Sequence, residues 1–192
     1  MKIINGMIFT DEFVFREGTV EIEDGKIANI RWGHTSKAEK NKDVIDASGK
    51  YVLPGLVDIH FHGCAGYDFC DATLESLNNI AAYEKKSGIT TICPASMTYS
   101  EDILTKIVEN AVKFRDAHAD KDADLKKYST IRGINLEGPF LSFAKRGAQN
   151  PKYLMKPDAS MLRRLQKKAD GLVKLVSIAP EIDGATECIK KC

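Results

Sequence analysis

The chain has 192 residues, of which 43% are hydrophobic and 29% are charged, and its formal net charge is +1. This balance is ordinary for a globular protein with a real core, and it leaves no basic excess for a nucleic acid or a membrane surface. We see no apolar run as long as a transmembrane helix and expect no signal peptide. Five cysteines without a CxxC pair favour reduced thiols, so we expect a cytoplasmic protein.

Residues 1–52 are expected to form a small β domain. The segment "TVEIEDGKIANI" contains two alternating stretches around Asp24-Gly25, a dipeptide that favours a two-residue hairpin turn with positive φ. The segments "KIINGMIF" and "VIDASGKYVL" supply further short strands.

Residues 53–192 alternate between apolar strands and amphipathic helices. Strands are predicted to start near 56, 89, 131 and 172. Helices are predicted over 73–87, over 101–117, from Asp158, and in the final segment "GATECIKKC". Ser100 and Asp158 are suitable N-cap residues for two of these helices.

This alternation predicts a parallel sheet covered by helices. Such a sheet is either an open doubly wound sheet or a closed (β/α)8 barrel. No glycine-rich phosphate loop follows the first strand, which disfavours the dinucleotide-binding version of the open sheet. A full barrel takes about 250 residues by itself. We therefore predict an α/β fold in which residues 53–192 are the first half of a TIM-type barrel, about four β/α units, truncated within the fourth helix.

The first predicted barrel strand carries an unusual polar pattern. In "LPGLVDIHFHGC" the residues Asp58, His60 and His62 occupy alternate positions, so they share one face of a strand. Active sites of barrels lie at the carboxyl ends of the strands. Two imidazoles at i and i+2 can reach one metal ion from the same side, and we favour this over two histidines in a hydrogen-bonded polar patch.

Glu137 ends the third predicted strand in "INLEGPF", at the same mouth of the barrel. A carboxylate that follows apolar residues is costly to bury unless it is paired or bound to a metal. Alone, Glu137 could equally be a salt-bridged residue at a strand end. Beside His60 and His62 it becomes the best candidate for a further metal ligand.

Several motifs in order resemble a known family. "PGLVDIHFHG" resembles the metal-binding first strand of the amidohydrolase superfamily, and the β domain with "DASGKYVLPG" resembles the β-sandwich of that superfamily. "NLEGPF", "KRGAQNP" and "SIAPE" resemble the N-acetylglucosamine-6-phosphate deacetylase family. The resemblance makes Glu137 the counterpart of the glutamate that binds the catalytic metal, and it implies substrate contacts at Ala148 and Gln149. Members that keep both histidines, as this chain does, can hold a second metal ion.

The resemblance implies hydrolysis of an N-acetyl amide on an amino-sugar phosphate, a small-molecule substrate, by a homodimeric protein. The cofactor would be one or two divalent metal ions, zinc first, with iron, manganese or cobalt as alternatives. The family's acid/base aspartate and its later metal-binding histidines have no counterpart in this sequence. We therefore expect no catalytic acid/base residue here and no activity from residues 1–192 alone.

Two other functions stay open. Another amidohydrolase, such as a cyclic amidase or a deaminase, would often use a carboxylated lysine on strand four, but Lys174 falls at the start of that strand. A non-catalytic half-barrel that acts as an interaction module is the other alternative. Other polar residues are assigned no role in chemistry: Cys64 and Cys70 lack an identifiable base, Lys145 and Arg146 are expected to be solvated, and His118 lies in a charged stretch.

Overall fold

The computed structural model of the protein describes residues 1–35, 43–119 and 122–192. The chain divides into two compact units, Met1–Pro54 and Gly55–Cys192. Within the residues that the structure describes, no helix combines the length and the hydrophobicity that crossing a bilayer requires.

The first unit is built on one five-stranded sheet in the order β3-β2-β1-β4, with β5 also paired to β1. Its strands are β1 (Lys2–Phe9), β2 (Phe15–Glu23), β3 (Lys26–Trp32), β4 (Val44–Asp46) and β5 (Tyr51–Val52). The hairpin predicted at Asp24-Gly25 is confirmed, since β2 and β3 pair antiparallel around these two residues, whose φ angles are +50° and +72°. The strands β4 and β5 both run parallel to β1.

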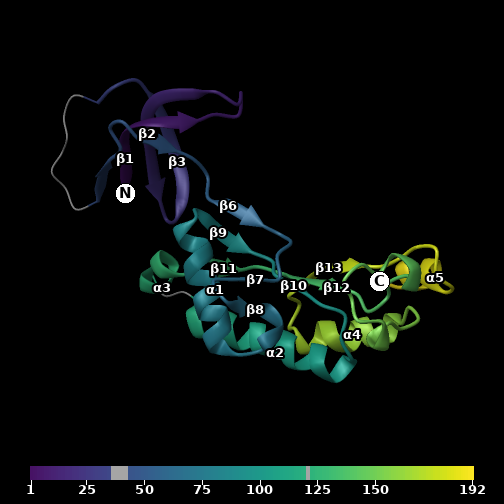
Figure 1. Ribbon diagram of the computed structural model, residues 1–192. Coiled ribbons are helices and arrows are strands. Elements are labelled where there is room, and N and C mark those ends of the chain that lie inside the picture. The colour runs from purple at the N-terminus through teal and green to yellow at the C-terminus, as the bar shows by residue number, and fades with distance from the viewer. Residues whose placement is uncertain (36–42, 120–121) are drawn as a thin grey trace. The chain divides into compact units, whose positions relative to one another are not determined.

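The second unit alternates strands and helices, as Figure 1 shows. Its strands are β6 (Leu56–Asp58), β7 (Gly63–Cys64), β8 (Tyr67–Asp68), β9 (Ile89–Ile92), β10 (Ala95–Ser96), β11 (Thr130–Ile131), β12 (Ile134–Glu137) and β13 (Val173–Ser177). Its helices are α1 (Leu74–Lys86), α2 (Glu101–His118), α3 (Asp122–Lys127), α4 (Ala159–Lys168) and α5 (Ala185–Lys190). Three short 3-10 helices, η1 (Phe69–Asp71), η2 (Phe143–Lys145) and η3 (Pro151–Tyr153), lie in the connections.

The strands that alternate with the long helices are parallel. They form the sheets β11-β9-β6 and β10-β12-β13. In the sequence, β10 directly follows β9 and β12 directly follows β11. Counted in this way, β6, β9–β10, β11–β12 and β13 are four parallel segments, and each one pairs with the next along the chain. The predicted parallel arrangement with helical crossovers is therefore confirmed for these segments.

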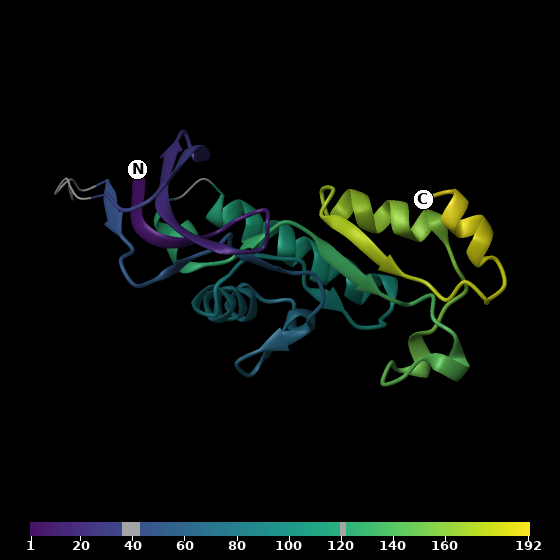
Figure 2. The same cartoon turned by 90° about the horizontal axis from the view of Figure 1, so that it is seen from above.

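The helices pack on the strands through one apolar core, and α1, α2 and α4 follow one another along the sheet (Figures 1 and 2). Leu77 of α1, Ile107 of α2, Leu165 of α4 and Leu136 of β12 are all fully buried in this core. Two helix starts are fixed by side chains: Thr73 accepts the backbone N–H of Ser76, and Asp158 accepts that of Ser160. The latter confirms the N-cap predicted at Asp158, whereas the side chain of Ser100, the residue before α2, makes no capping hydrogen bond among the described residues.

The structure differs from the prediction that Asp58, His60 and His62 share one face of a single strand, because β6 ends at Asp58. Oδ1 of Asp58 accepts the backbone N–H of His60 at 2.9 Å, a turn that competes with the strand ladder. The next residues still run beside the neighbouring strand, since the N–H of Ala95 donates to the carbonyl of Phe61 at 2.8 Å. His60 and His62 therefore lie in a tethered loop just beyond the carboxyl end of β6.

Candidate metal centre

The loop that carries the two histidines is held by hydrogen bonds to its backbone. Nδ2 of Asn135 donates to the carbonyl of Ile59 at 3.3 Å, and the N–H of Phe69 donates to the carbonyl of His62 at 2.7 Å. The hairpin of β7 and β8 follows His62 directly. The positions of His60 and His62 are thus fixed by the strand before them, the strand beside them and the hairpin after them.

Glu137 is the last residue of β12, and the chain turns away immediately after it. Gly138 has φ of +88°, and a Cβ atom on this residue would lie 2.1 Å from Oγ1 of Thr98. Only glycine meets both conditions, because side chains rarely adopt this backbone conformation and the space is already filled. The close approach lets the hydroxyl of Thr98 donate to the backbone carbonyl of Glu137 at 3.3 Å.

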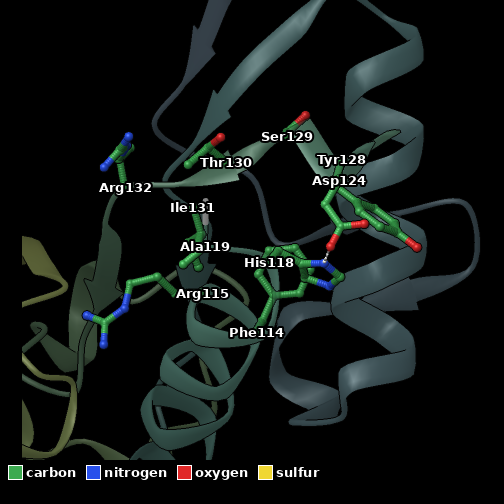
Figure 3. A pocket seen from close by; sticks show the side chains of 10 residues that line it. All are labelled: Phe114, Arg115, His118, Ala119, Asp124, Tyr128, Ser129, Thr130, Ile131 and Arg132. Atoms are coloured by element: carbon green, nitrogen blue, oxygen red, sulfur yellow. Dashed lines mark hydrogen bonds and ion pairs between the residues drawn. The ribbon is translucent and has the colours of Figure 1, made fainter. Parts of the chain in front are cut away.

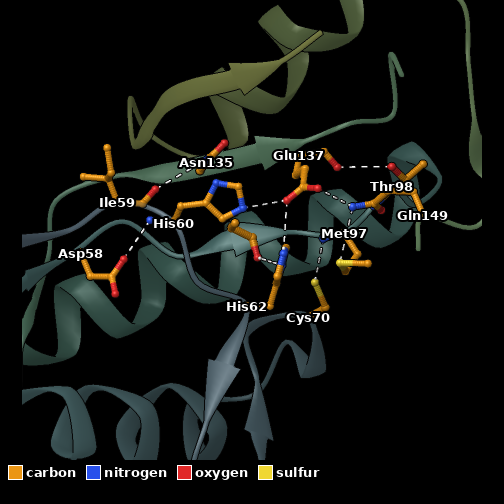
Figure 4. A network of polar contacts seen from close by, with 11 residues as sticks. Asp58, Ile59, His60, His62, Cys70, Met97, Thr98, Asn135, Glu137 and Gln149 are labelled. Carbon is orange, nitrogen blue, oxygen red and sulfur yellow. Dashed lines mark hydrogen bonds and ion pairs between the residues drawn. The ribbon is translucent and has the colours of Figure 1, made fainter. Parts of the chain in front are cut away.

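The three predicted ligands meet at one point, as Figure 4 shows. Nε2 of His60 lies 2.9 Å from Oε2 of Glu137, and Nε2 of His62 lies 3.2 Å from the same oxygen. One ligand atom from each residue lies within 4.8 Å of the others. The side chains of His60, His62 and Glu137 are 53%, 34% and 23% exposed, so the cluster is open to solvent on one side.

The tautomer of His62 follows from its second nitrogen. Nδ1 lies 3.1 Å from the backbone carbonyl of Ala95, which can only accept, so Nδ1 carries a hydrogen. In the neutral ring the lone pair of Nε2 then faces Oε2 of Glu137. Two acceptors at 3.2 Å need a proton between them, on the ring or on the carboxyl group, or a metal ion.

The donor set fits a divalent metal ion. Two imidazole nitrogens and one carboxylate oxygen are ligands of zinc, iron and related metals, and a backbone carbonyl that accepts from the far side of the ring is the usual support of a metal-bound histidine. Among the residues that the structure describes, His60, His62 and Glu137 form the one such cluster of histidine, cysteine and acidic side chains. The arrangement can hold a metal ion and leave its exposed side to a small molecule.

The two residues expected to contact a substrate differ in exposure. Ala148 is exposed, whereas Gln149 is buried with 5% of its surface accessible. Oε1 of Gln149 accepts the backbone N–H of Thr98 at 2.7 Å, and Nε2 donates to Oε1 of Glu137 at 2.8 Å. The side chain of Gln149 is therefore directed at Glu137 from within the protein.

The cysteines near the site do not have the character of nucleophiles. Burial raises the pKa of the Cys70 thiol to about 12, and Sγ accepts the backbone N–H of Met97 at 3.3 Å. Burial, with Glu84 beside it, raises the pKa of the Cys64 thiol to about 11. Because the thiolate is the reactive form, the structure agrees with the expectation that these are unreactive thiols.

His118 lies away from the metal cluster, beside a pocket of about 310 Å³ (Figure 3). Nδ1 lies 2.9 Å from Oδ2 of Asp124, Nε2 lies 2.8 Å from Oδ1 of Asn78, and the ring packs between Phe114 and Tyr128. His118 thus connects α1, α2 and α3, a structural role in line with the sequence-based interpretation.

Sequence reasoning missed the residues that surround Glu137 without being ligands. Thr98 and Met97 follow β10, and both contact the network through their backbone or side chains. Their position in the sequence could have indicated them, because they follow β10, and the carboxyl end of β10 adjoins that of β12 in a parallel sheet. Residue type alone gave no indication, since threonine and methionine are common in loops.

Comparison with known proteins gives a family match over most of the chain. The model of the amidohydrolase family matches residues 51–192. The N-acetylglucosamine-6-phosphate deacetylase of Bacillus subtilis (strain 168) is 31% identical over 183 residues, which cover 95% of this chain and 45% of that protein. The chain therefore spans about half the length of the curated relatives it matches.

Solved structures of deacetylases are also similar to this chain. A mutant N-acetyl-D-glucosamine-6-phosphate deacetylase from Mycobacterium smegmatis, in complex with N-acetyl-D-glucosamine-6-phosphate, is 28% identical, with a TM-score of 0.77, covering 100% of this chain and 46% of that one. The N-acetylglucosamine-6-phosphate deacetylase from Pasteurella multocida has a TM-score of 0.81, with coverage of 99% and 48%. At 22% identity the latter is evidence for the fold alone.

Proposed function

The chain belongs to the amidohydrolase family, and from this premise we propose that the whole protein hydrolyses the N-acetyl amide of N-acetylglucosamine-6-phosphate. The products are glucosamine-6-phosphate and acetate. The proposal is supported by the similarity to deacetylases from Bacillus subtilis and Mycobacterium smegmatis, the second of which was solved with this sugar phosphate bound.

The observation that carries the proposal is the meeting of His60, His62 and Glu137 on a single carboxylate oxygen. In a neutral His62 ring that carries its hydrogen on Nδ1, the lone pair of Nε2 is aimed at that oxygen, an arrangement that suits a metal ion shared by the two residues. A divalent cation bound by such ligands polarises an amide carbonyl and lowers the pKa of a bound water. Zinc is the proposed metal, with iron, manganese or cobalt as alternatives, in one or two ions.

The residues of this chain have distinct parts in the proposed reaction. Glu137, His62 and His60 would hold one or two metal ions at the carboxyl ends of neighbouring strands, with His60 serving mainly the second ion. The exposed Ala148 and the backbone of Gln149 are proposed to contact the sugar, because the side chain of Gln149 is already occupied by Glu137 and Thr98. The acid/base group that moves a proton to the leaving nitrogen stays a prediction for residues outside this sequence.

The finer architecture is also part of the proposal. Residues 53–192 would be the first four β/α units of a barrel, and residues 1–52 would contribute one sheet of a β-sandwich. A homodimer and a cytoplasmic location stay predictions from the resemblance.

A cyclic amidase or deaminase that relies on a strand-four lysine is a weaker candidate. Glu137 is paired with Ser177 in the parallel register, and Lys174 lies three residues earlier on β13. At about 3.3 Å per residue, Lys174 is roughly 10 Å back along the strand from the metal cluster. Its position beside Gly133 supports a location at the opposite end of the strand from the site.

The test is metal analysis of the complete natural protein together with acetate release from N-acetylglucosamine-6-phosphate. We expect about one to two equivalents of a divalent metal per chain and acetate release that a chelator abolishes. Metal-free protein that releases acetate, or metal-loaded protein that leaves the sugar phosphate intact, would contradict the proposal.

A further inference from the structure

Gln149 lies in the connection between η2 and η3, 12 residues after Glu137. The residues on either side of it are exposed, but Gln149 is buried, with only 5% of its surface accessible. A glutamine is costly to bury unless its amide is satisfied, so the partners of this amide indicate why it is buried.

The hydrogen-bond partners of the Gln149 amide determine which of its two terminal atoms is the oxygen. The backbone N–H of Thr98 can only donate, so the atom that meets it at 2.7 Å must be the oxygen Oε1. Nε2 is then the atom that lies 2.8 Å from Oε1 of Glu137, and it donates to that carboxylate. The second hydrogen of Nε2 points toward Sδ of Met97 at 3.6 Å.

Glu137 is thereby divided between two tasks. Its Oε1 is occupied by Gln149, while its Oε2 faces both histidines. We propose that Gln149 is a positioning residue that fixes the rotation of the Glu137 carboxylate, so that Oε2 alone is presented to the metal ion. This rests on the metal site proposed above.

Gln149 could position Glu137 for the metal ion, or it could serve only to satisfy the backbone N–H of Thr98. Both amide hydrogens of Gln149 are directed to partners inside the protein, so its side chain has no donor left for a sugar hydroxyl. A glutamine that merely satisfied the N–H of Thr98 would be a structural element with no effect on the metal. The two roles predict different metal affinities after substitution.

The experiment is zinc titration of the 192-residue chain and its variants by calorimetry or competition with a chromophoric chelator. Gln149→Met keeps the length of the side chain and removes its donor, and we expect zinc affinity to fall about 10–100-fold. Gln166→Met is the matched control, since the side-chain amide of Gln166 bonds the backbone of Val173, at 3.0 Å through both amide atoms. The control should lose stability and keep its zinc affinity within about twofold.

A second variant and a spectrum guard against a fold defect. Gln149→Asn keeps a buried amide but is one methylene too short to reach Glu137, and it should weaken zinc binding in the same direction. The visible spectrum of the cobalt-loaded chain should change in both Gln149 variants and stay unchanged in Gln166→Met.

The outcomes are distinct. If Gln149→Met and Gln166→Met bind zinc equally well, or lose affinity equally, the positioning role is overturned while the metal site stands. If the unsubstituted chain binds no zinc, or binds it equally well after Glu137→Gln, the proposed site itself fails.

Discussion

Nε2 of His60 lies 2.9 Å from Oε2 of Glu137, although 77 residues separate the two in the sequence. The contact exists because the strands before them are parallel and share a neighbour: β6 pairs with β9, and β10, which follows β9, pairs with β12. The carboxyl ends of parallel strands meet at one edge, so residues placed there come together whatever their separation. The site is thus a consequence of topology.

The turn after Glu137 should be intolerant of any side chain. Gly138→Ala would place a methyl group 2.1 Å from Oγ1 of Thr98 in a left-handed backbone conformation. We expect it to lower the free energy of unfolding and to weaken zinc binding, because either Thr98 or Glu137 must move. Denaturant unfolding and zinc titration measure the two effects.

Gly147→Ala is the control for backbone strain, since Gly147 also has positive φ, +61°, but nothing lies within 4 Å of an added Cβ. It should cost about 1–2 kcal/mol through conformation alone. Equal losses in the two variants would show that the packing of Gly138 against Thr98 is unimportant.

The link between α2 and α4 should make stability depend on pH. Nε and Nη2 of Arg164 donate to the two carboxylate oxygens of Glu101 at 2.6 and 2.8 Å, and these bonds lower the pKa of Glu101. A lowered folded-state pKa gives stability that is present above the ordinary glutamate pKa of about 4.3 and lost as pH falls through the folded value.

Glu101→Gln should therefore be less stable than the parent chain by up to about 1 kcal/mol at pH 7, because the pair is partly exposed. The difference should shrink in acid, below the ordinary glutamate pKa. Denaturant unfolding at several pH values measures it. A difference that grows in acid would reverse the assigned sign.

Cys70 should resist alkylation. With a pKa of about 12, roughly one thiol in ten thousand is ionised at pH 8. Iodoacetamide should label the exposed Cys192 first and leave Cys70 unlabelled until the chain is unfolded in urea. Mass spectrometry of the peptides distinguishes the two, and fast labelling of Cys70 in the folded chain would contradict its assignment as an unreactive thiol.

The repeating pattern of the second unit was predictable because strands and helices leave different periods in the sequence. The start of α4 followed from its capping residue Asp158, and the meeting of His60, His62 and Glu137 followed from the rule that strand ends share an edge. These features depend on local sequence and on the order of strands and helices, and both can be read from one amino-acid sequence.

Other features depend on contacts between distant residues and could not be predicted. The early end of β6 depends on the side chain of Asp58 turning back to its own backbone. The inward orientation of Gln149 depends on the N–H of Thr98, which lies 51 residues earlier.

His60 should differ from Glu137 in its importance. In the complete natural protein, His60→Asn should reduce deacetylation less than Glu137→Gln does, since the resemblance assigns His60 mainly to a second metal ion. Parallel measurement of acetate release and of metal content per chain tests this. Equal loss of activity and of metal in both variants would argue for one shared ion.

The most direct test of the central claim is zinc binding by the 192-residue chain with and without Glu137. The account predicts one site per chain of saturable affinity, which Glu137→Gln abolishes or weakens by at least about tenfold, while the fold, followed by circular dichroism, is unchanged. A Glu137→Gln chain that binds zinc as tightly as the parent would contradict the assignment of His60, His62 and Glu137 as a metal centre.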